Sequence, residues 1–137
     1  MLEKPDPDGR EIALTHASRD ILEQLGAWQY IPENDISRLQ DAKIFNGKSS
    51  RPLHVTAALG NVQELGYFVP NHWIRRSLYA SVKGQSNAAI VGSTSVTAID
   101  VAEQANTLHL SNGEKVSARL VVAADSRYSE TRRMMGI

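Results

Sequence analysis

The sequence predicts a mixed α/β fold in which strands and helices are interleaved along one domain's length of chain. Its 137 residues are 42% hydrophobic and 22% charged, as in an ordinary globular domain. Segments with the two-residue period of strands flank two segments with the 3.6-residue period of helices. The resulting order is strands, helix, strands, helix and then several strands. This order argues against a helical bundle or a β-sandwich.

The chain begins with a turn-rich stretch that leads into a helix. Residues 2–4 are typical of the end of a strand, and the run from 5 to 9 (PDPDG) predicts a turn. Thr15 is suited to cap a helix over about 16–25, and Gly26 is suited to end it. The residues that we expect to face a core from this helix are Ala17, Ile21, Leu22 and Leu25.

Three strands and a second helix are predicted in the middle of the chain. Residues 41–47 predict a strand that ends in an Asn-Gly turn, residues 52–58 its partner, and residues 65–69 a third strand. Asn71 is suited to cap a helix over about 72–83. Its apolar stripe is expected to consist of Ile74, Leu78 and Val82, with Arg75 and Arg76 outside it.

The last third is rich in strand signals. Short strands are expected at 88–91 and within 93–102. The Asn112-Gly113 pair predicts a hairpin that joins strands at 107–110 and 115–118.

Residues 120–124 (LVVAA) form a continuous apolar run. Such a run predicts a central strand buried on both faces, as in a parallel sheet covered by helices. Asp125 closes the run, and a short helix is expected over about 130–135.

Composition argues against several functional classes. Fifteen basic and fifteen acidic residues cancel, so we expect no nucleic-acid partner. The chain has no cysteine, and its four histidines lack metal-ligand spacing, so we expect no metal site. No apolar stretch approaches the roughly 20 residues that span a bilayer, and the first residues do not resemble a signal peptide. These patterns predict a cytoplasmic location and leave open a peripheral contact with the inner face of the membrane.

Residues 118–133 (ARLVVAADSRYSETRR) contain the most specific motif. This segment resembles the D-G-x-x-S-x-x-R motif of the p-hydroxybenzoate-hydroxylase class of flavoprotein monooxygenases. Asp125, Ser129 and Arg132 match the motif, and Ser126 stands where that family has glycine. Because glycine permits positive φ, this departure bears on the local turn. The resemblance implies that the aspartate reaches the pyrophosphate–ribose part of FAD, near the approach of NAD(P)H.

Three other segments agree with this resemblance. Glu3 resembles the acid at the end of a second Rossmann strand, which binds the adenosine ribose. Arg10 opens a segment that resembles the family's R-x-x-A-L…L-G-x-W pattern, in which the arginine lies along the flavin. Asn71 falls at the strand–helix junction where an amide side chain contacts the flavin. The A-L-T and L-G-x-W stretches of the Arg10 segment most resemble those of the ubiquinone-biosynthesis hydroxylases.

The resemblance implies a segment of a longer enzyme that uses FAD, NAD(P)H and O2 to hydroxylate an aromatic ring, here a polyprenyl phenol or quinol. The family's G-x-G-x-x-G strand–turn–helix would precede residue 1. Residues 1–40 are then expected to connect from an FAD-binding Rossmann-like domain, residues 41–70 to form part of a substrate-domain sheet, and residues 71–137 to return to the FAD-binding domain. The FAD contacts would be Glu3, Arg10, Asn71, Asp125 and Arg132, and no catalytic acid or base is assigned.

Without the phosphate-binding loop, we expect the isolated chain to bind FAD weakly, to lack hydroxylase activity and to self-associate through open sheet edges. The partners implied are the small aromatic or prenylated quinol substrate, the membrane surface and a ubiquinone-biosynthesis complex. The alternatives are a reductase or halogenase of the same fold, or a non-enzymatic remnant that serves as an interaction domain. For single residues the alternatives are structural. Asp125 and Asn71 would serve as helix caps, and Arg10 and Glu3 as solvated surface charges.

Overall fold

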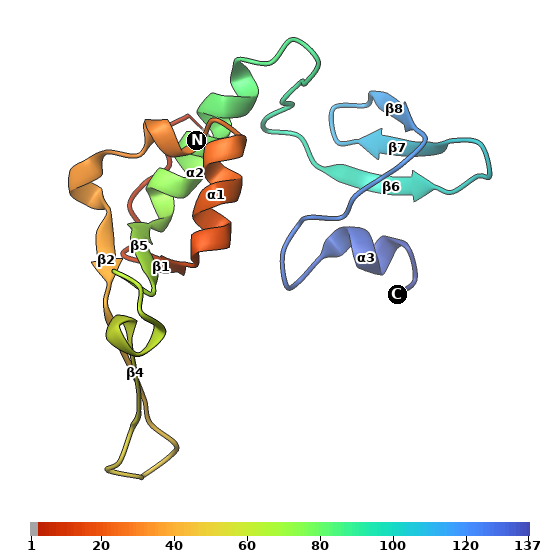
Figure 1. Ribbon diagram of the computed structural model, residues 1–137. Helices are drawn as coiled ribbons and strands as arrows, with labels where there is room; N and C mark the ends of the chain where they lie inside the picture. The colour runs from red at the N-terminus through yellow and green to blue at the C-terminus, as the bar shows by residue number, and fades with distance from the viewer. Residues whose placement is uncertain (1–2) are drawn as a thin grey trace. The chain divides into compact units, whose positions relative to one another are not determined.

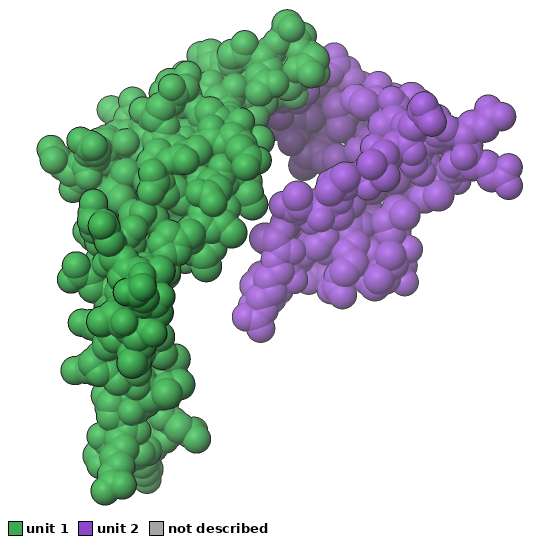
Figure 2. Space-filling model, viewed as in Figure 1, with its two compact units in different colours: residues 1–90 green, residues 91–137 purple. Residues whose placement is uncertain are grey.

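The computed structural model describes residues 3–137 and divides the chain into two compact units. The first ends at Ile90 and the second runs from Val91 to Ile137 (Figure 2). Strands and helices are interleaved along both, which confirms the mixed α/β class. All strand pairs within residues 3–137 are antiparallel.

A three-stranded sheet organises the first unit. Its central strand, β5 (Gly66–Pro70), is flanked by β1 (Glu11–Leu14) and β2 (Ser37–Leu39) (Figure 1). The β1–β5 register pairs Glu11 with Pro70 and continues to Leu14 and Tyr67. This register brings the start of β1 next to the end of β5.

Helix α1 (His16–Gln24) begins and ends as its sequence predicts. The Thr15 hydroxyl accepts a hydrogen bond from the Ser18 backbone N–H over 3.2 Å, and Gly26 adopts a φ of +66° just beyond the helix. Among the four expected core residues, only Leu22 is buried. The prediction for Ala17, Ile21 and Leu25 was wrong, because no element of this unit covers their side chains, and Ile21 and Leu25 are each more than half exposed.

Helix α2 (Asn71–Lys83) follows β5 directly. Pro70 occupies the N-cap position, with no side-chain capping hydrogen bond. The prediction that Asn71 caps the helix was therefore wrong: Asn71 is its first residue, and its side chain donates a hydrogen bond to Asp8 instead. Arg75 and Arg76 are exposed as predicted.

The core of the first unit lies between the sheet, α2 and the segment that joins α1 to β2. Ile31, Tyr67 and Val69 are its buried centre. Two short 3-10 helices, η1 (Trp28–Tyr30) and η2 (Glu33–Asp35), connect α1 to β2. The partly buried residues packed around the centre are Leu14, Trp28, Ile36, Trp73 and Ile74.

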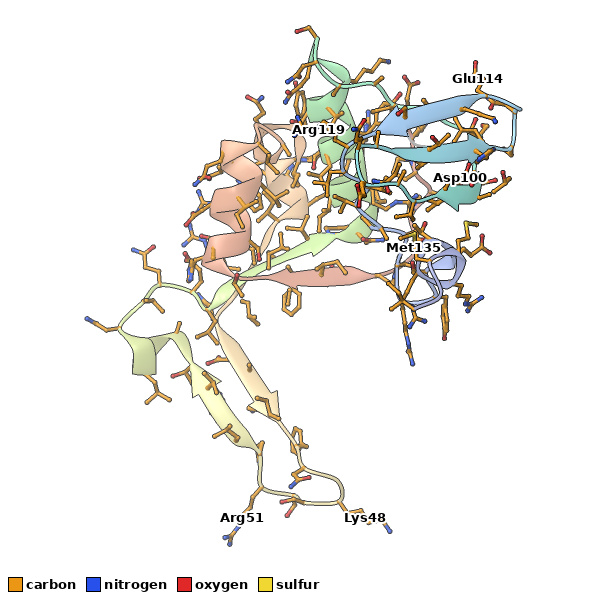
Figure 3. The ribbon with its side chains drawn as sticks, turned by 90° about the vertical axis from the view of Figure 1, so that its right-hand side faces the viewer. Lys48, Arg51, Asp100, Glu114, Arg119 and Met135 are labelled. Atoms are coloured by element: carbon orange, nitrogen blue, oxygen red, sulfur yellow. The ribbon has the colours of Figure 1, made fainter. Side chains whose placement is uncertain are left out.

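A two-stranded hairpin extends from this unit. Strand β3 (Asp41–Ile44) pairs with β4 (Leu53–Thr56), which confirms the predicted pairing, and a 3-10 helix, η3 (Ala57–Gly60), follows. Lys48 and Arg51 lie in the connection between the two strands (Figure 3).

The second unit is an antiparallel meander followed by a short helix. Its strands are β6 (Val96–Asp100), β7 (Asn106–Leu110) and β8 (Lys115–Ala118), and its helix is α3 (Glu130–Met134). Gly113 turns between β7 and β8 with a φ of +86°, as the Asn-Gly signal predicts.

Three predicted strands do not form. Residues 88–91 are exposed and form no strand. Residues 120–124 form none either, because the described part of the chain offers them no partner, and Leu120 and Val122 are largely exposed. At the N-terminus, Glu3 and Lys4 form a bend, and Leu2 lies outside the described residues. None of the helices within residues 3–137 combines the length and the apolar composition that a membrane span requires.

Candidate functional site

Two of the predicted cofactor contacts, Arg10 and Asn71, meet at one carboxylate. Asp8 Oδ2 accepts hydrogen bonds from Arg10 Nε at 2.8 Å, from Arg10 Nη2 at 2.6 Å and from Asn71 Nδ2 at 2.7 Å. Asp8 Oδ1 accepts from the Arg10 backbone N–H at 3.1 Å. The three residues form the cluster that we call the Asp8 cluster.

The strand register explains why residues 63 positions apart are neighbours. Arg10 directly precedes β1 and Asn71 directly follows β5, and these strands pair antiparallel with Glu11 opposite Pro70. The Asn71 backbone N–H donates to the Arg10 carbonyl over 2.9 Å, which extends the pairing by one step. The sheet therefore positions the cluster at its edge.

The cluster is open to solvent. The Arg10 side chain is 67% exposed and that of Asp8 is 28% exposed. Hydrogen bonds from the Arg10 and Asn71 side chains and from the Arg10 backbone lower the pKa of Asp8 far below its ordinary value, so the carboxylate is ionised. A hollow of about 360 Å³ beside it is lined by Pro7, Gly9, Arg10, Glu11, Pro70 and His72.

Glu3 lies elsewhere in the first unit. Its carboxylate accepts hydrogen bonds from Lys83 Nζ and, over 3.2 Å, from the Tyr79 hydroxyl. The Lys83 ammonium, followed by the Tyr79 hydroxyl, lowers the pKa of Glu3. Lys83 ends α2, whereas Asn71 begins it, and twelve residues of helix rise about 18 Å. The structure therefore does not bring Glu3 to the Asp8 cluster.

Asp125 forms a local turn with the other residues of its motif in the second unit. Its Oδ2 accepts from the Thr131 backbone N–H over 2.9 Å, and the Ser129 hydroxyl, the N-cap of α3, accepts from the Arg132 backbone N–H over 2.9 Å. The Ser129 hydroxyl and the Thr131 N–H lower the pKa of Asp125 far below its ordinary value. Ser126 adopts a φ of +80°, the conformation that the family's glycine takes readily.

Arg132 lies in α3, beside an apolar hollow within the second unit. The hollow has a volume of about 310 Å³ and also takes in part of the exposed run 120–124. Arg132 is exposed. The other residues that line the hollow are Ile99, Asn106, Leu120, Val121, Ala123, Thr131, Met135 and Ile137.

Sequence reasoning missed Asp8. The residue stands in the PDPDG stretch, which predicts only a turn. The usable signal was an acid two residues before the arginine of the R-x-x-A-L segment, since this spacing allows a side chain to bond back to a neighbouring backbone N–H.

Sequence comparison finds relatives over almost the whole chain. The chain is 46% identical to the ubiquinone hydroxylase UbiM of Neisseria meningitidis, across all of this chain and 31% of that protein. It is 29% identical to the ubiquinone hydroxylase UbiL of Rhodospirillum rubrum, across 95% of this chain and 30% of that protein. It is 26% identical to the 3-demethoxyubiquinol 3-hydroxylase of Escherichia coli, across 96% of this chain and 33% of that protein. No family model matches the chain.

Solved structures share the fold. The OxyS anhydrotetracycline hydroxylase of Streptomyces rimosus superposes with a TM-score of 0.75 at 18% identity, over 99% of this chain and 28% of that one. The 2,6-dihydroxypyridine-3-hydroxylase of Arthrobacter nicotinovorans superposes with a TM-score of 0.61 at 19% identity, over 98% of this chain and 32% of that one.

The chain thus spans about a third of the length of the curated relatives that it matches. It is a partial homologue of the ubiquinone hydroxylases, which confirms the family resemblance predicted from its sequence.

Proposed function

We propose that this chain is a segment of an FAD- and NAD(P)H-dependent hydroxylase that acts on the ring of a ubiquinone precursor. The observation that carries this proposal is the 46% identity to a ubiquinone hydroxylase along the entire chain. The substrate would be an aromatic phenol or quinol with a polyprenyl tail. When bound, the flavin supplies the electron transfer and oxygen activation that side chains cannot provide.

Within this proposal, five residues contact FAD: Glu3, Arg10, Asn71, Asp125 and Arg132. The Asp8 cluster fits such a role, because Arg10 and Asn71 converge there and Arg10 keeps unused N–H donors toward solvent. Asp125 would combine its capping contact with a cofactor contact, since a carboxylate can accept more than one hydrogen bond. The role of this chain's residues is to bind and orient the cofactor.

Within this proposal, the chain divides between the two domains of the longer enzyme. Residues 1–40 would connect from the FAD-binding domain, residues 41–70 would belong to the substrate-domain sheet, and residues 71–137 would return to the FAD-binding domain. The β3–β4 hairpin supports the second assignment, because two isolated strands are marginal in water and gain stability by joining a larger sheet.

A chimera tests the proposal. The chain would replace the aligned segment of the Neisseria meningitidis enzyme, and the purified product would be examined for bound flavin and for NAD(P)H- and O2-dependent hydroxylation of a prenylated phenol. Stoichiometric flavin and turnover are expected. A folded chimera without flavin would contradict the proposal.

The chain alone serves as the complementary sample. No glycine-rich phosphate loop occurs in its sequence, so we expect FAD titrated into it to bind weakly and without turnover. Tight one-to-one binding by the isolated chain would contradict this division of roles.

A further inference from the structure

The Asp8 carboxylate is unusually well supplied with donors for an exposed group. Four N–H groups from Arg10 and Asn71 point at its two oxygens, at distances between 2.6 and 3.1 Å. Three of them share Oδ2. Arg10 and Asn71 belong to different strands at the same end of the antiparallel β1–β5 pair, so the carboxylate joins two elements rather than closing a local turn alone.

The contact with Asp8 fixes how Arg10 is presented. The guanidinium uses Nε and one N–H of Nη2 on the carboxylate, which leaves Nη1 and the second Nη2 hydrogen without a contact to Asp8. The side chain is 67% exposed, so these remaining donors are accessible. A free arginine on a surface samples many rotamers, whereas a charge-assisted pair of hydrogen bonds selects one orientation.

The same carboxylate fixes which end of the Asn71 amide faces outward. An amide has a donor end and an acceptor end, and Asp8 can bond only the donor end because an ionised carboxylate only accepts. Nδ2 is therefore turned toward Asp8, and Oδ1 is left as the acceptor for another group.

We propose that Asp8 is a positioning residue, which presents the free donors of Arg10 and the carbonyl oxygen of Asn71 together to the cofactor. This inference rests on the proposed function for its ligand, and on the three hydrogen-bonded side chains for its geometry. Asp8 itself contacts no ligand in this assignment, because all three side-chain donors around it already converge on Oδ2. Asp8 contributes preorganisation, because two side chains that are already ordered lose less conformational entropy when the cofactor binds.

The first test uses the chain as it is. Nitrogen-15 NMR would follow the Arg10 Nε–H and the Asn71 side-chain amide in the wild type, in Asp8→Ala and in the matched control Asp6→Ala, which removes an exposed acid from the same turn. We expect Asp8→Ala to speed exchange of the Arg10 Nε–H with water by about tenfold or more and to shift the Asn71 amide signals, because both lose a charge-assisted partner. Unchanged signals in a folded Asp8→Ala variant would overturn the positioning role.

The second test measures whether the positioning by Asp8 increases the affinity for FAD. In the chimera described above, FAD affinity and the flavin absorption spectrum would be measured for Asp8→Ala, Arg10→Ala, the double variant and Asp6→Ala. We expect Asp8→Ala to weaken FAD binding by about tenfold in the presence of Arg10 and by much less in its absence, since residues that act through one another are not additive. Additive losses would overturn the inference, as would an Asp8→Ala chimera that binds FAD like the Asp6→Ala control.

The two tests separate the inference from the function on which it rests. A wild-type chimera without flavin contradicts the proposed function, while the NMR comparison still decides whether Asp8 orients its two partners. A wild-type chimera with flavin whose affinity is indifferent to Asp8 leaves the proposed function standing and overturns the inference.

Discussion

The guanidinium of Arg19 on α1 donates a hydrogen bond from Nη1 to the hydroxyl of Tyr67 on β5 over 2.7 Å. The hydroxyl in turn donates to Glu64 Oε1 over 2.8 Å. The guanidinium carbon also lies 5.4 Å from the ring centre of Trp28 and 5.1 Å from that of Tyr67, within cation–π range. Hydrogen bonds from Arg19 to Glu23, and then to Tyr67, raise the pKa of Arg19. These contacts anchor α1 to the sheet of the first unit.

Substitution of Tyr67 by phenylalanine tests this anchor. The variant removes the hydroxyl that joins Arg19 to Glu64, whose Oε2 has no hydrogen-bond partner within residues 3–137 and only an ion pair with Arg38 at 3.5 Å. We expect a loss of about 1–3 kcal/mol in the free energy of unfolding, the usual cost of unsatisfied polar groups in a protein interior. Urea unfolding followed by circular dichroism would measure it. Tyr79→Phe is the matched control, because its hydroxyl bonds Glu3 at the surface and its loss should cost less than about 0.5 kcal/mol.

The structural features that the sequence predicted are those that depend on neighbouring residues. The Thr15 cap, the positive φ of Gly26 and the hairpin at Gly113 each follow from a few adjacent side chains, and each is present. The wrong strand predictions concern segments whose state depends on distant partners. Residues 120–124 have strand composition, but a strand requires a second strand, and none in the described chain pairs with them.

At the candidate site, too, the sequence identified single residues but not the long-range contacts between them. The family resemblance selected Arg10 and Asn71, and their meeting follows from the β1–β5 register, which no local pattern determines. Asp8 escaped notice because its partner Asn71 is 63 residues away along the chain. The resemblance also selected Glu3, which the structure places near the other end of α2.

Replacement of Ser126 by glycine should stabilise the folded chain. A non-glycine residue in the left-handed region costs roughly 1–2 kcal/mol, and Ser126 has a φ of +80°. Glycine relieves this cost but loses about 0.5–1 kcal/mol through its freer unfolded state. We expect a net gain of up to about 1 kcal/mol in the free energy of unfolding, measured by urea titration. Ser117→Gly in β8, where no positive φ is required, should instead lose stability. A loss in both variants would contradict this account of Ser126.

Gly66 is expected to tolerate no side chain. A Cβ on Gly66 would lie 2.2 Å from the Leu14 carbonyl oxygen, which belongs to the neighbouring strand and is not a flexible side-chain end. Gly66→Ala should therefore separate β1 from β5 locally and cost about 3 kcal/mol or more, at the upper end of overpacking effects. Thermal unfolding would measure it against Gly60→Ala, whose Cβ would meet Val62 Cγ2 at an ordinary 3.6 Å. Equal stability of the two variants would show that β1 can move away from Gly66 without a loss in the free energy of unfolding.

Asp125 should make the chain sensitive to acid. Its pKa in the folded chain lies far below the ordinary value of 3.8, because the Ser129 hydroxyl and the Thr131 N–H bond its ionised form. The stabilisation is therefore complete above about pH 5 and is lost as the pH falls through the unfolded-state pKa toward the folded-state pKa. We expect Asp125→Asn to flatten the decline of the urea midpoint between about pH 5 and pH 2. Glu103→Gln, an exposed acid of the same unit, should leave the wild-type decline unchanged.

The run of residues 120–124 should make the isolated chain self-associate. Leu120 is 78% exposed and Val122 is 75% exposed, and no backbone–backbone hydrogen bond involves residues 120–124 within the described chain. Unpaired backbone beside exposed apolar side chains favours pairing with another chain. We expect sedimentation velocity to show a mass that rises with concentration, and Val122→Lys to suppress the rise, because a charge is costly in a closely paired apolar strand. Val101→Lys changes an equally apolar side chain, 63% exposed, outside the run and should leave association intact. Monomers at every concentration, or equal suppression by both variants, would show that this run is not the surface through which the chains meet.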